Sequence, residues 1–281
     1  MTTIPFIIQA GMSTEDYQQK NSHYVKKRID KQPAGLNFYE YRWPVKENGQ
    51  VRVDAGSASF LIPNVLSIVG TEDTEALSRG IYDFSINSGL TPDEFIEHDQ
   101  ARILLMSHLQ SLLTLGWKPY LEFHIYPRLS GKQSFQFAIE DGFYTPDPTY
   151  TPDLDEWMKL KYGGTWTFFN EKVFLEVRLR RESQFIDVNR PGVYLLTHTV
   201  LTNEAKAQSY FKGEERYKWQ SLWADEIKKD KRKRYEKEVE LIQQGYRINT
   251  RYVDPIIHPD DPIEPEDVEE LLAIIEQHAI E

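Results

Sequence analysis

Alternating apolar and polar residues predict several β-strands in the first part of this chain. Strand-like runs occupy residues 37–43, 52–53, 59–62, 65–69 and 81–86. Successive strand residues point to opposite faces, so this alternation gives a sheet with one apolar face. Asn48-Gly49 separates the first two runs and is a strong signal for a tight hairpin turn between paired strands.

A long amphipathic helix is predicted after these strands. Thr91-Pro92-Asp93-Glu94 reads as its start, because threonine caps helices, proline suits the first turn and carboxylates favour the positive end. Apolar residues then recur at helical spacing from Phe95 to Leu113. Gly116 is expected to end the helix in the left-handed conformation, and residues 117–125 read as an extended strand.

The same order of elements recurs in the second part of the chain. Runs 165–169 and 173–179 flank Asn170-Glu171 and predict a hairpin, and residues 193–201 predict a third strand. Helical patterns follow at 203–211 and 214–244, and residues 246–253, after Gly245, read as extended. We therefore predict an α+β fold in which antiparallel sheets are covered by long helices, built from two similar strand-strand-helix-strand halves.

Five segments follow from these patterns. They are a polar lead-in at 1–35, a first α+β half at 36–126, a Pro-rich connection at 127–164, a second half at 165–255 and an acidic C-terminal helix at 256–281. The last segment has a helix start at Pro265-Glu266-Asp267 and an apolar stripe, so we expect it to dock on its own domain or, as an alternative, on another chain.

Charge and composition narrow the function classes. The chain of 281 residues carries 33 Lys and Arg against 44 Asp and Glu, a net charge of -11, which argues against a binder of nucleic-acid backbones. Cysteine is absent, so disulfides and thiolate metal sites are excluded. No apolar stretch approaches the ~18 residues of a membrane span, and no signal sequence is evident, so we expect a cytoplasmic protein.

One basic run interrupts this acidic composition. Residues 228–234 read Lys-Lys-Asp-Lys-Arg-Lys-Arg in the middle of the long predicted helix. A nucleic-acid patch is one interpretation, but glutamates follow at once at positions 236, 238 and 240. Lysines and carboxylates at helical spacing are typical of a solvated helix face, and we predict such a face for this run.

No pattern of catalytic residues stands out. The seven histidines lack ligand spacing, the phosphate-binding and nucleophile-elbow motifs are missing, and we predict no enzyme activity, no metal and no cofactor. Carboxylate pairs such as Glu140-Asp141 and Asp260-Asp261 could hold a divalent ion, but helix caps and solvated turns explain them better. An enzyme with a dispersed carboxylate site stays as an alternative.

A partner-binding surface is the more specific prediction. The loop-rich stretch 140–157 combines aromatic residues, which supply contact area at interfaces, with carboxylates, which steer basic partners. The alternative is a connection whose aromatics pack back on the core. The candidate contact residues are Glu140, Asp141, Tyr144, Asp147, Tyr150, Asp153, Asp155 and Glu156.

Several short blocks are spaced along residues 80–250. They are Gly116-Trp117-Lys118-Pro119-Tyr120, Pro127-Arg128-Leu129-Ser130-Gly131, Trp157-Met158-Lys159, Trp166-Thr167-Phe168-Phe169 and the run from Val173 to Arg181. In these blocks and in its order of elements the chain resembles a group of cytoplasmic immunity proteins, which are encoded beside type VI secretion effectors and related polymorphic toxins.

This resemblance implies that the protein binds and neutralises one cognate secreted antibacterial toxin by stoichiometric contact, without catalysis. If that toxin is a nuclease, its phosphate-binding site is basic and suits an acidic inhibitor. The implied partner is the toxin domain. We expect no binding to nucleic acid or membrane, and a homodimer is an open alternative. A type VI chaperone or adaptor that loads the effector is the main alternative.

Overall fold

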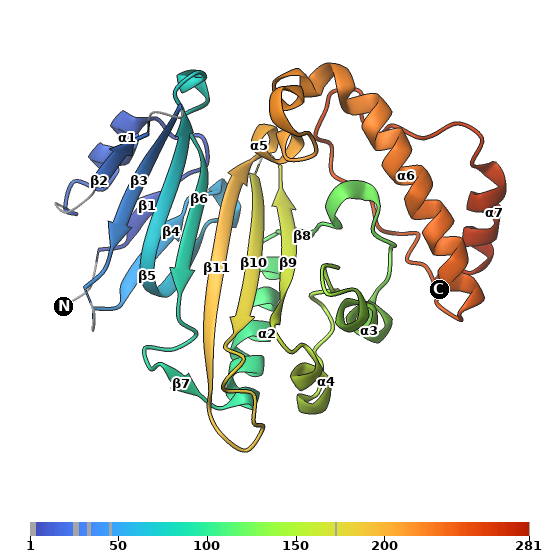
Figure 1. Ribbon diagram of the computed structural model, residues 1–281, viewed down its shortest axis with the longest axis horizontal. Coiled ribbons are helices and arrows are strands. Elements are labelled where there is room, and N and C mark those ends of the chain that lie inside the picture. The colour runs from blue at the N-terminus through green and yellow to red at the C-terminus, as the bar shows by residue number, and fades with distance from the viewer. Residues whose placement is uncertain (1–3, 25–27, 33–34, 45–46, 172, 281) are drawn as a thin grey trace.

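One large mixed β-sheet with helices on one face and beyond one edge forms the protein (Figure 1). The computed structural model describes residues 4–24, 28–32, 35–44, 47–171 and 173–280. The predicted α+β class is confirmed. The sheet is mixed rather than purely antiparallel, because the first strand runs parallel to its neighbour.

The described strands follow the path β1-β4-β5-β6-β11-β10-β9-β8, with β2 and β3 branching from β5 and β7 beside β11. Pairs other than β1–β4 are antiparallel. Their bounds are β1 (Phe6–Ile8), β2 (Arg28–Lys31), β3 (Leu36–Arg42), β4 (Gly49–Val53), β5 (Phe60–Asp73), β6 (Ile81–Ser88), β7 (Phe95–Ile96), β8 (Lys118–Pro119), β9 (Gly163–Asn170), β10 (Val173–Arg181) and β11 (Gly192–Thr202).

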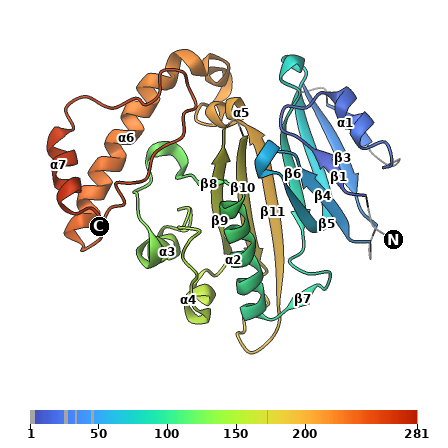
Figure 2. The ribbon, with the colours of Figure 1, turned by 180° about the vertical axis from the view of Figure 1, so that it is seen from behind.

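The helices lie in two groups, and Figure 2 shows α1 and α2 on the near face of the sheet. No helix in the described ranges is both long enough and apolar enough to cross a bilayer. Their bounds are α1 (Thr14–Lys20), α2 (His98–Thr114), α3 (Gly131–Asp141), α4 (Leu154–Lys159), α5 (Asn203–Gln208), α6 (Trp219–Gln243) and α7 (Glu269–Gln277), with the short 3₁₀ turns η1 (Gly56–Ala58), η2 (Leu77–Arg79), η3 (Glu122–His124) and η4 (Gly213–Lys218).

Strand β5 replaces two predicted strands and explains an error in the expected pairing. It is 14 residues long, so one edge has room for β4 beside its first part and β3 beside its second. The hairpin predicted at Asn48-Gly49 is therefore wrong, because β3 and β4 each pair with β5. The hairpin predicted at Asn170-Glu171 is confirmed by the β9–β10 pairing.

The main core fills the space between the sheet and helices α1 and α2. Phe6, Ile8, Met12 and Tyr17 are buried in it, so the segment 1–35 contributes a strand, a helix and core side chains rather than a polar lead-in. Helix α2 begins at His98 instead of near Thr91, because the chain first adds β7 to the edge of β11.

Helix α6 does not repeat the role of α2. Its apolar side chains, including Trp223 and Tyr235, pack in smaller clusters with η3, α3, α5 and α7 beyond the sheet edge. Residues 246–253 form no strand, and Ile248 makes only an isolated bridge to Ala279. The predicted similarity of the two halves is not confirmed. The C-terminal helix docks on its own chain, since α7 packs against α6.

Candidate functional site

A groove opens on the face of β9 and β10 that points away from α2. Leu175, Val177 and Leu179 of β10 point into the core beneath α2, so the alternate residues of this strand must point to the opposite face. In Figure 1 that face of β9, β10 and β11 is turned to the viewer, while α2 lies behind the sheet. Sequence alternation thus places Glu176, Arg178 and Arg180 on the open side.

The groove has a volume of about 440 Å³ and lies where this sheet face meets the segment after α3, the start of η3 and the residues that follow η3. We call it the aromatic groove. Its lining residues come from four separate parts of the chain: Glu122, Tyr126, Gly142, Phe143, Thr145, Tyr162, Gly163, Gly164, Thr165, Glu176, Arg178, Leu179 and Arg180.

Two aromatic rings project from the rim of the aromatic groove into solvent. Phe143 is 83% exposed and Tyr162 is 74% exposed. Gly142 ends α3 in the left-handed conformation, and the amide of Phe143 donates to Asp141 Oδ1 at 3.1 Å, which fixes the turn that presents the ring. Large apolar rings in water are unfavourable alone, so an exposed pair of this kind indicates a contact surface.

Gly163 lets β9 begin directly beside the end of β10. Its φ is +103°, and a Cβ at this position would lie 1.9 Å from the carbonyl oxygen of Leu179. Only glycine fits there, because any side chain would clash with that backbone atom. The close approach brings Tyr162 next to the open sheet face.

One end of the aromatic groove holds two carboxylates and a buried lysine. Lys206 of α5 is 2% exposed, and its Nζ donates to Glu122 Oε1 at 2.5 Å and to Glu176 Oε1 at 3.1 Å. Burial raises the pKa of Glu176, which Lys206 opposes and the Glu122 charge increases. Burial and the Glu176 charge also raise the pKa of Asp83 to about 6. Burial and the neighbouring carboxylates therefore favour the protonated forms of these two carboxyl groups.

Three residues of the predicted contact surface are instead used inside the protein. Tyr144 is buried and its hydroxyl donates to the Pro127 carbonyl at 3.0 Å. Glu156 is buried, accepts from the Tyr150 hydroxyl at 2.7 Å and pairs with Lys132 at 2.8 Å. Tyr144, Tyr150 and Glu156 therefore follow the alternative prediction, in which residues of this stretch pack on the protein's own core.

Of the other predicted contact residues, two stabilise local structure with their side chains and three are exposed to solvent. Asp153 is exposed, but its carboxylate caps α4 in a capping box with Glu156, and Asp147 accepts from the Gly131 amide at 2.7 Å. Glu140, Asp141 and Asp155 are exposed. Glu140 and Asp141 immediately precede Gly142 and Phe143 at the rim of the aromatic groove.

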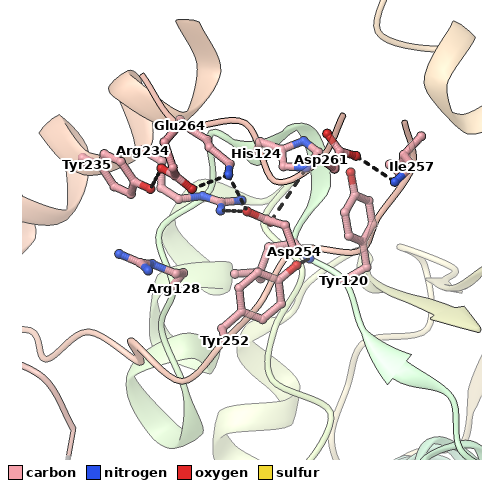
Figure 3. A network of polar contacts seen from close by, with 12 residues as sticks. Tyr120, His124, Arg128, Arg234, Tyr235, Tyr252, Asp254, Ile257, Asp261 and Glu264 are labelled. Atoms are coloured by element: carbon pink, nitrogen blue, oxygen red, sulfur yellow. Dashed lines mark hydrogen bonds and ion pairs between the residues drawn. The ribbon is translucent and has the colours of Figure 1, made fainter. Parts of the chain in front are cut away.

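A second cluster of charged groups, shown in Figure 3, lies between α6, η3 and the segment after Val253. Lys231 and Arg234 are buried in it, Asp254 is half-buried and Glu264 is exposed. Arg234 donates to Asp254 at 2.7 Å, and Glu264 accepts from Lys231 at 2.6 Å and from the Tyr235 hydroxyl at 2.6 Å. Burial alone would raise the pKa of Asp254, but Arg234 and the other nearby cations outweigh it and lower the value to about 2.

This network ties the acidic C-terminal segment to the basic run of α6. Lys231 and Arg234 are buried by it, so only part of the run 228–234 is the solvated face that we predicted. Asp261, which we considered as a metal ligand, accepts from the Trp223 indole at 3.0 Å and from two backbone amides. Arg234 Nε and Nη2 and Asp254 Oδ1 make no hydrogen bond within the described part of the chain. Lys231 and Arg234 nevertheless each pair with a carboxylate, and we interpret the network as structural.

Several histidines are buried in the fold. His98, His124 and His198 are all buried, and His108 is half-buried beside His198. Within the described residues, no group of three or more metal-ligating side chains comes together.

Sequence reasoning missed most of the aromatic groove. The charges at 176, 178 and 180 on alternate positions of a strand were the available signal for an open polar face. Nothing local indicated that Glu122 and Tyr162 would meet that face, because tertiary packing brings them there. Comparison of the chain with family models, with curated proteins and with solved structures finds no match.

Proposed function

We propose that the protein is a cytoplasmic immunity protein, which binds and neutralises a cognate secreted antibacterial toxin by stoichiometric contact. The observation that supports this most is the aromatic groove, with Phe143 and Tyr162 exposed on its rim. Aromatic side chains supply large contact area at low entropic cost and dominate the binding energy of many interfaces. A sheet and capped helix ends hold these rings in place, which reduces the ordering cost of binding.

The charge of the molecule supports a basic partner. The net charge is -11, and the exposed carboxylates Glu140 and Asp141 immediately precede the groove residues Gly142 and Phe143. Complementary charge speeds association and selects partners more than it adds affinity. A nuclease toxin, whose substrate-binding surface must be basic, fits this description.

Co-expression tests the proposal. The toxin domain encoded by the adjacent reading frame is induced in bacteria with and without this chain, and the purified pair is examined by size-exclusion chromatography with light scattering. Survival together with a complex of fixed stoichiometry is expected, and the same measurement reports whether the free chain dimerises. A loading chaperone would bind the targeting region of the effector and give no protection. Neither protection nor a complex would refute both.

One observation favours a second candidate, an enzyme with an acid–base carboxylate pair. Glu122 and Glu176 converge in the aromatic groove, and the pKa of Glu176 is raised, mainly by burial. Such a carboxylate can stay protonated long enough to act as a general acid. The variant Glu176→Gln distinguishes the two candidate functions. It would abolish turnover in an enzyme, whereas an inhibitor would keep its exposed aromatic contacts.

A further inference from the structure

The polar side chains along β10 give the aromatic groove a direction. Glu176, Arg178 and Arg180 occupy alternate positions of one strand and all line the groove. Strand residues rise by about 3.3 Å each, so Glu176 and Arg180 lie roughly 13 Å apart along the strand. The floor of the groove therefore changes from acidic to basic over about four residues.

Among the residues that the structure describes, one ammonium pairs with the two carboxylates at the acidic end. Glu122 and Glu176 share the ammonium of Lys206, which reaches them from α5 and is buried. Two carboxylates against one ammonium leave excess negative charge, and the ring of Tyr126 lines the same groove. A carboxylate pair with an aromatic face beside it is the chemistry that recognises a Lys or Arg side chain.

The basic end is open to solvent. Arg178 and Arg180 are both exposed, and Arg178 makes a long 3.5 Å hydrogen bond to Thr165 Oγ1. Guanidinium groups on a sheet face can bind a carboxylate through paired N–H donors. The exposed residues Phe143 and Tyr162 line the same groove, and the Tyr162 carbonyl accepts from the Arg181 amide at 3.2 Å, which places Tyr162 at the basic end.

We propose that the aromatic groove receives an extended segment of the toxin, with a Lys or Arg side chain at the Glu176 end and a carboxylate at the Arg180 end. This inference rests on the proposed function, since it identifies the chemistry of the partner at that site. Apolar side chains of the segment contact Phe143 and Tyr162. An extended segment matches the spacing because its own alternate side chains repeat at the same interval as those of β10.

Peptide titration followed by NMR tests the groove without the toxin. The probe is the heptapeptide acetyl-Thr-Lys-Thr-Val-Thr-Glu-Thr-amide, in which the two charges are four residues apart. Saturable shifts are expected for the amides of Gly142, Phe143, Gly163 and Gly164, with affinity at least ten-fold above that of a peptide with Gln at both charged positions. Peptides with two Lys or two Glu are expected to bind more weakly than the mixed one.

Variants of exposed groove residues supply the second arm. Phe143→Ala and Arg180→Glu are each expected to weaken binding of the mixed peptide and of the toxin domain by ten-fold or more. Phe95→Ala removes a ring that is 49% exposed, and Arg190→Glu reverses a charge that is 82% exposed in the loop between β10 and β11. Neither residue lines the groove, so both variants should bind normally.

The outcomes separate this inference from the proposed function. If the toxin domain binds both groove variants as tightly as the unmodified chain, the groove assignment is wrong while the inhibitor function stands. If the unmodified chain does not bind the toxin domain, the proposed function fails and the peptide titration alone decides the groove. Equal shifts with charged and neutral peptides, or shifts elsewhere, would overturn the charge-matched occupant.

Discussion

His108 of α2 and His198 of β11 meet with their Nε2 atoms 2.9 Å apart, joining the main helix to the sheet. This geometry needs one nitrogen to donate and the other to accept, so at least one of the two imidazoles must be neutral. Burial lowers the pKa of His108 to about 4, and burial and the neighbouring His108 lower the pKa of His198 well below its ordinary value. The contact is therefore a neutral one at physiological pH.

Acid should weaken this contact. A histidine whose pKa is lowered in the folded state binds protons first in the unfolded chain, so its stabilisation is present above pH 6.5 and is lost as pH falls toward 4. A loss on the order of 2 kcal/mol in the free energy of unfolding is expected for His108 across this window.

Urea unfolding at pH 7.5 and at pH 4.5 measures this loss. Asp83, whose pKa is raised, contributes an opposite slope, so the informative quantity is the difference between the unmodified chain and His108→Gln. The variant should lose less stability between the two pH values. If the variant and the unmodified chain lose the same stability between the two pH values, the histidine pair does not control acid sensitivity.

Removing one member of the Arg234–Asp254 pair should be costly. Arg234→Met leaves the carboxylate of Asp254 buried without its 2.7 Å partner, and a loss of about 3–5 kcal/mol in the free energy of unfolding is expected. Lys229→Met breaks a surface pair with Glu226 on the same helix and should change stability little. Calorimetric unfolding of the two variants compares them, and similar values would refute a structural role for the buried network.

Gly163 is expected to tolerate no side chain. Gly163→Ala brings a methyl group within 1.9 Å of the Leu179 carbonyl oxygen and should cost about 2–3 kcal/mol through the forced separation of β9 and β10. Gly116→Ala is the matched control, because its φ of +96° is similar while nothing lies within 4 Å. Gly116→Ala should lower the free energy of unfolding by only about 1 kcal/mol. Thermal unfolding compares the two variants, and equal losses of stability would show that the clash at Gly163 is unimportant.

Lys206 should matter more at neutral than at acidic pH. Lys206→Met leaves Glu122 and Glu176 facing each other without a cation, and about 3 kcal/mol of stability should be lost at pH 7. The pKa of Glu176, already raised by burial, should rise further, so part of this loss should be recovered at pH 5 as the carboxyl binds a proton. Lys212→Met, at an exposed position, should show neither effect in chemical unfolding.

Local signals correctly predicted the elements that local interactions determine. The β9–β10 hairpin follows from alternation around a two-residue turn, and α2 ends before Gly116 as expected from its glycine. The extended strand predicted at 246–253 is wrong. The alternating aromatic residues of this segment pack under α6, where the Tyr252 hydroxyl accepts from the Leu121 amide, and do not pair in the sheet. Periodicity shows which side of a segment is buried and not what covers it.

The candidate site was predictable only in part. Acidic residues before Phe143 were identified from composition, and Glu140 and Asp141 do lie exposed beside the aromatic groove. Tyr144 and Glu156 belong to the same stretch, yet they are buried, because aromatic and acidic residues serve core packing and helix capping equally well. Glu122, Tyr162 and Arg180 come from distant positions that only the folded chain brings together.

Titration of the toxin's activity with the purified chain tests the central claim most directly. The toxin domain is held at a fixed concentration well above the dissociation constant, and its residual activity is measured against added chain. A stoichiometric inhibitor gives a linear fall to a sharp end point at a fixed molar ratio, with no further change over time. Phe143→Ala, which weakens binding, rounds the curve around that end point. Progressive inactivation by substoichiometric chain, or full toxin activity at excess chain, would contradict this account.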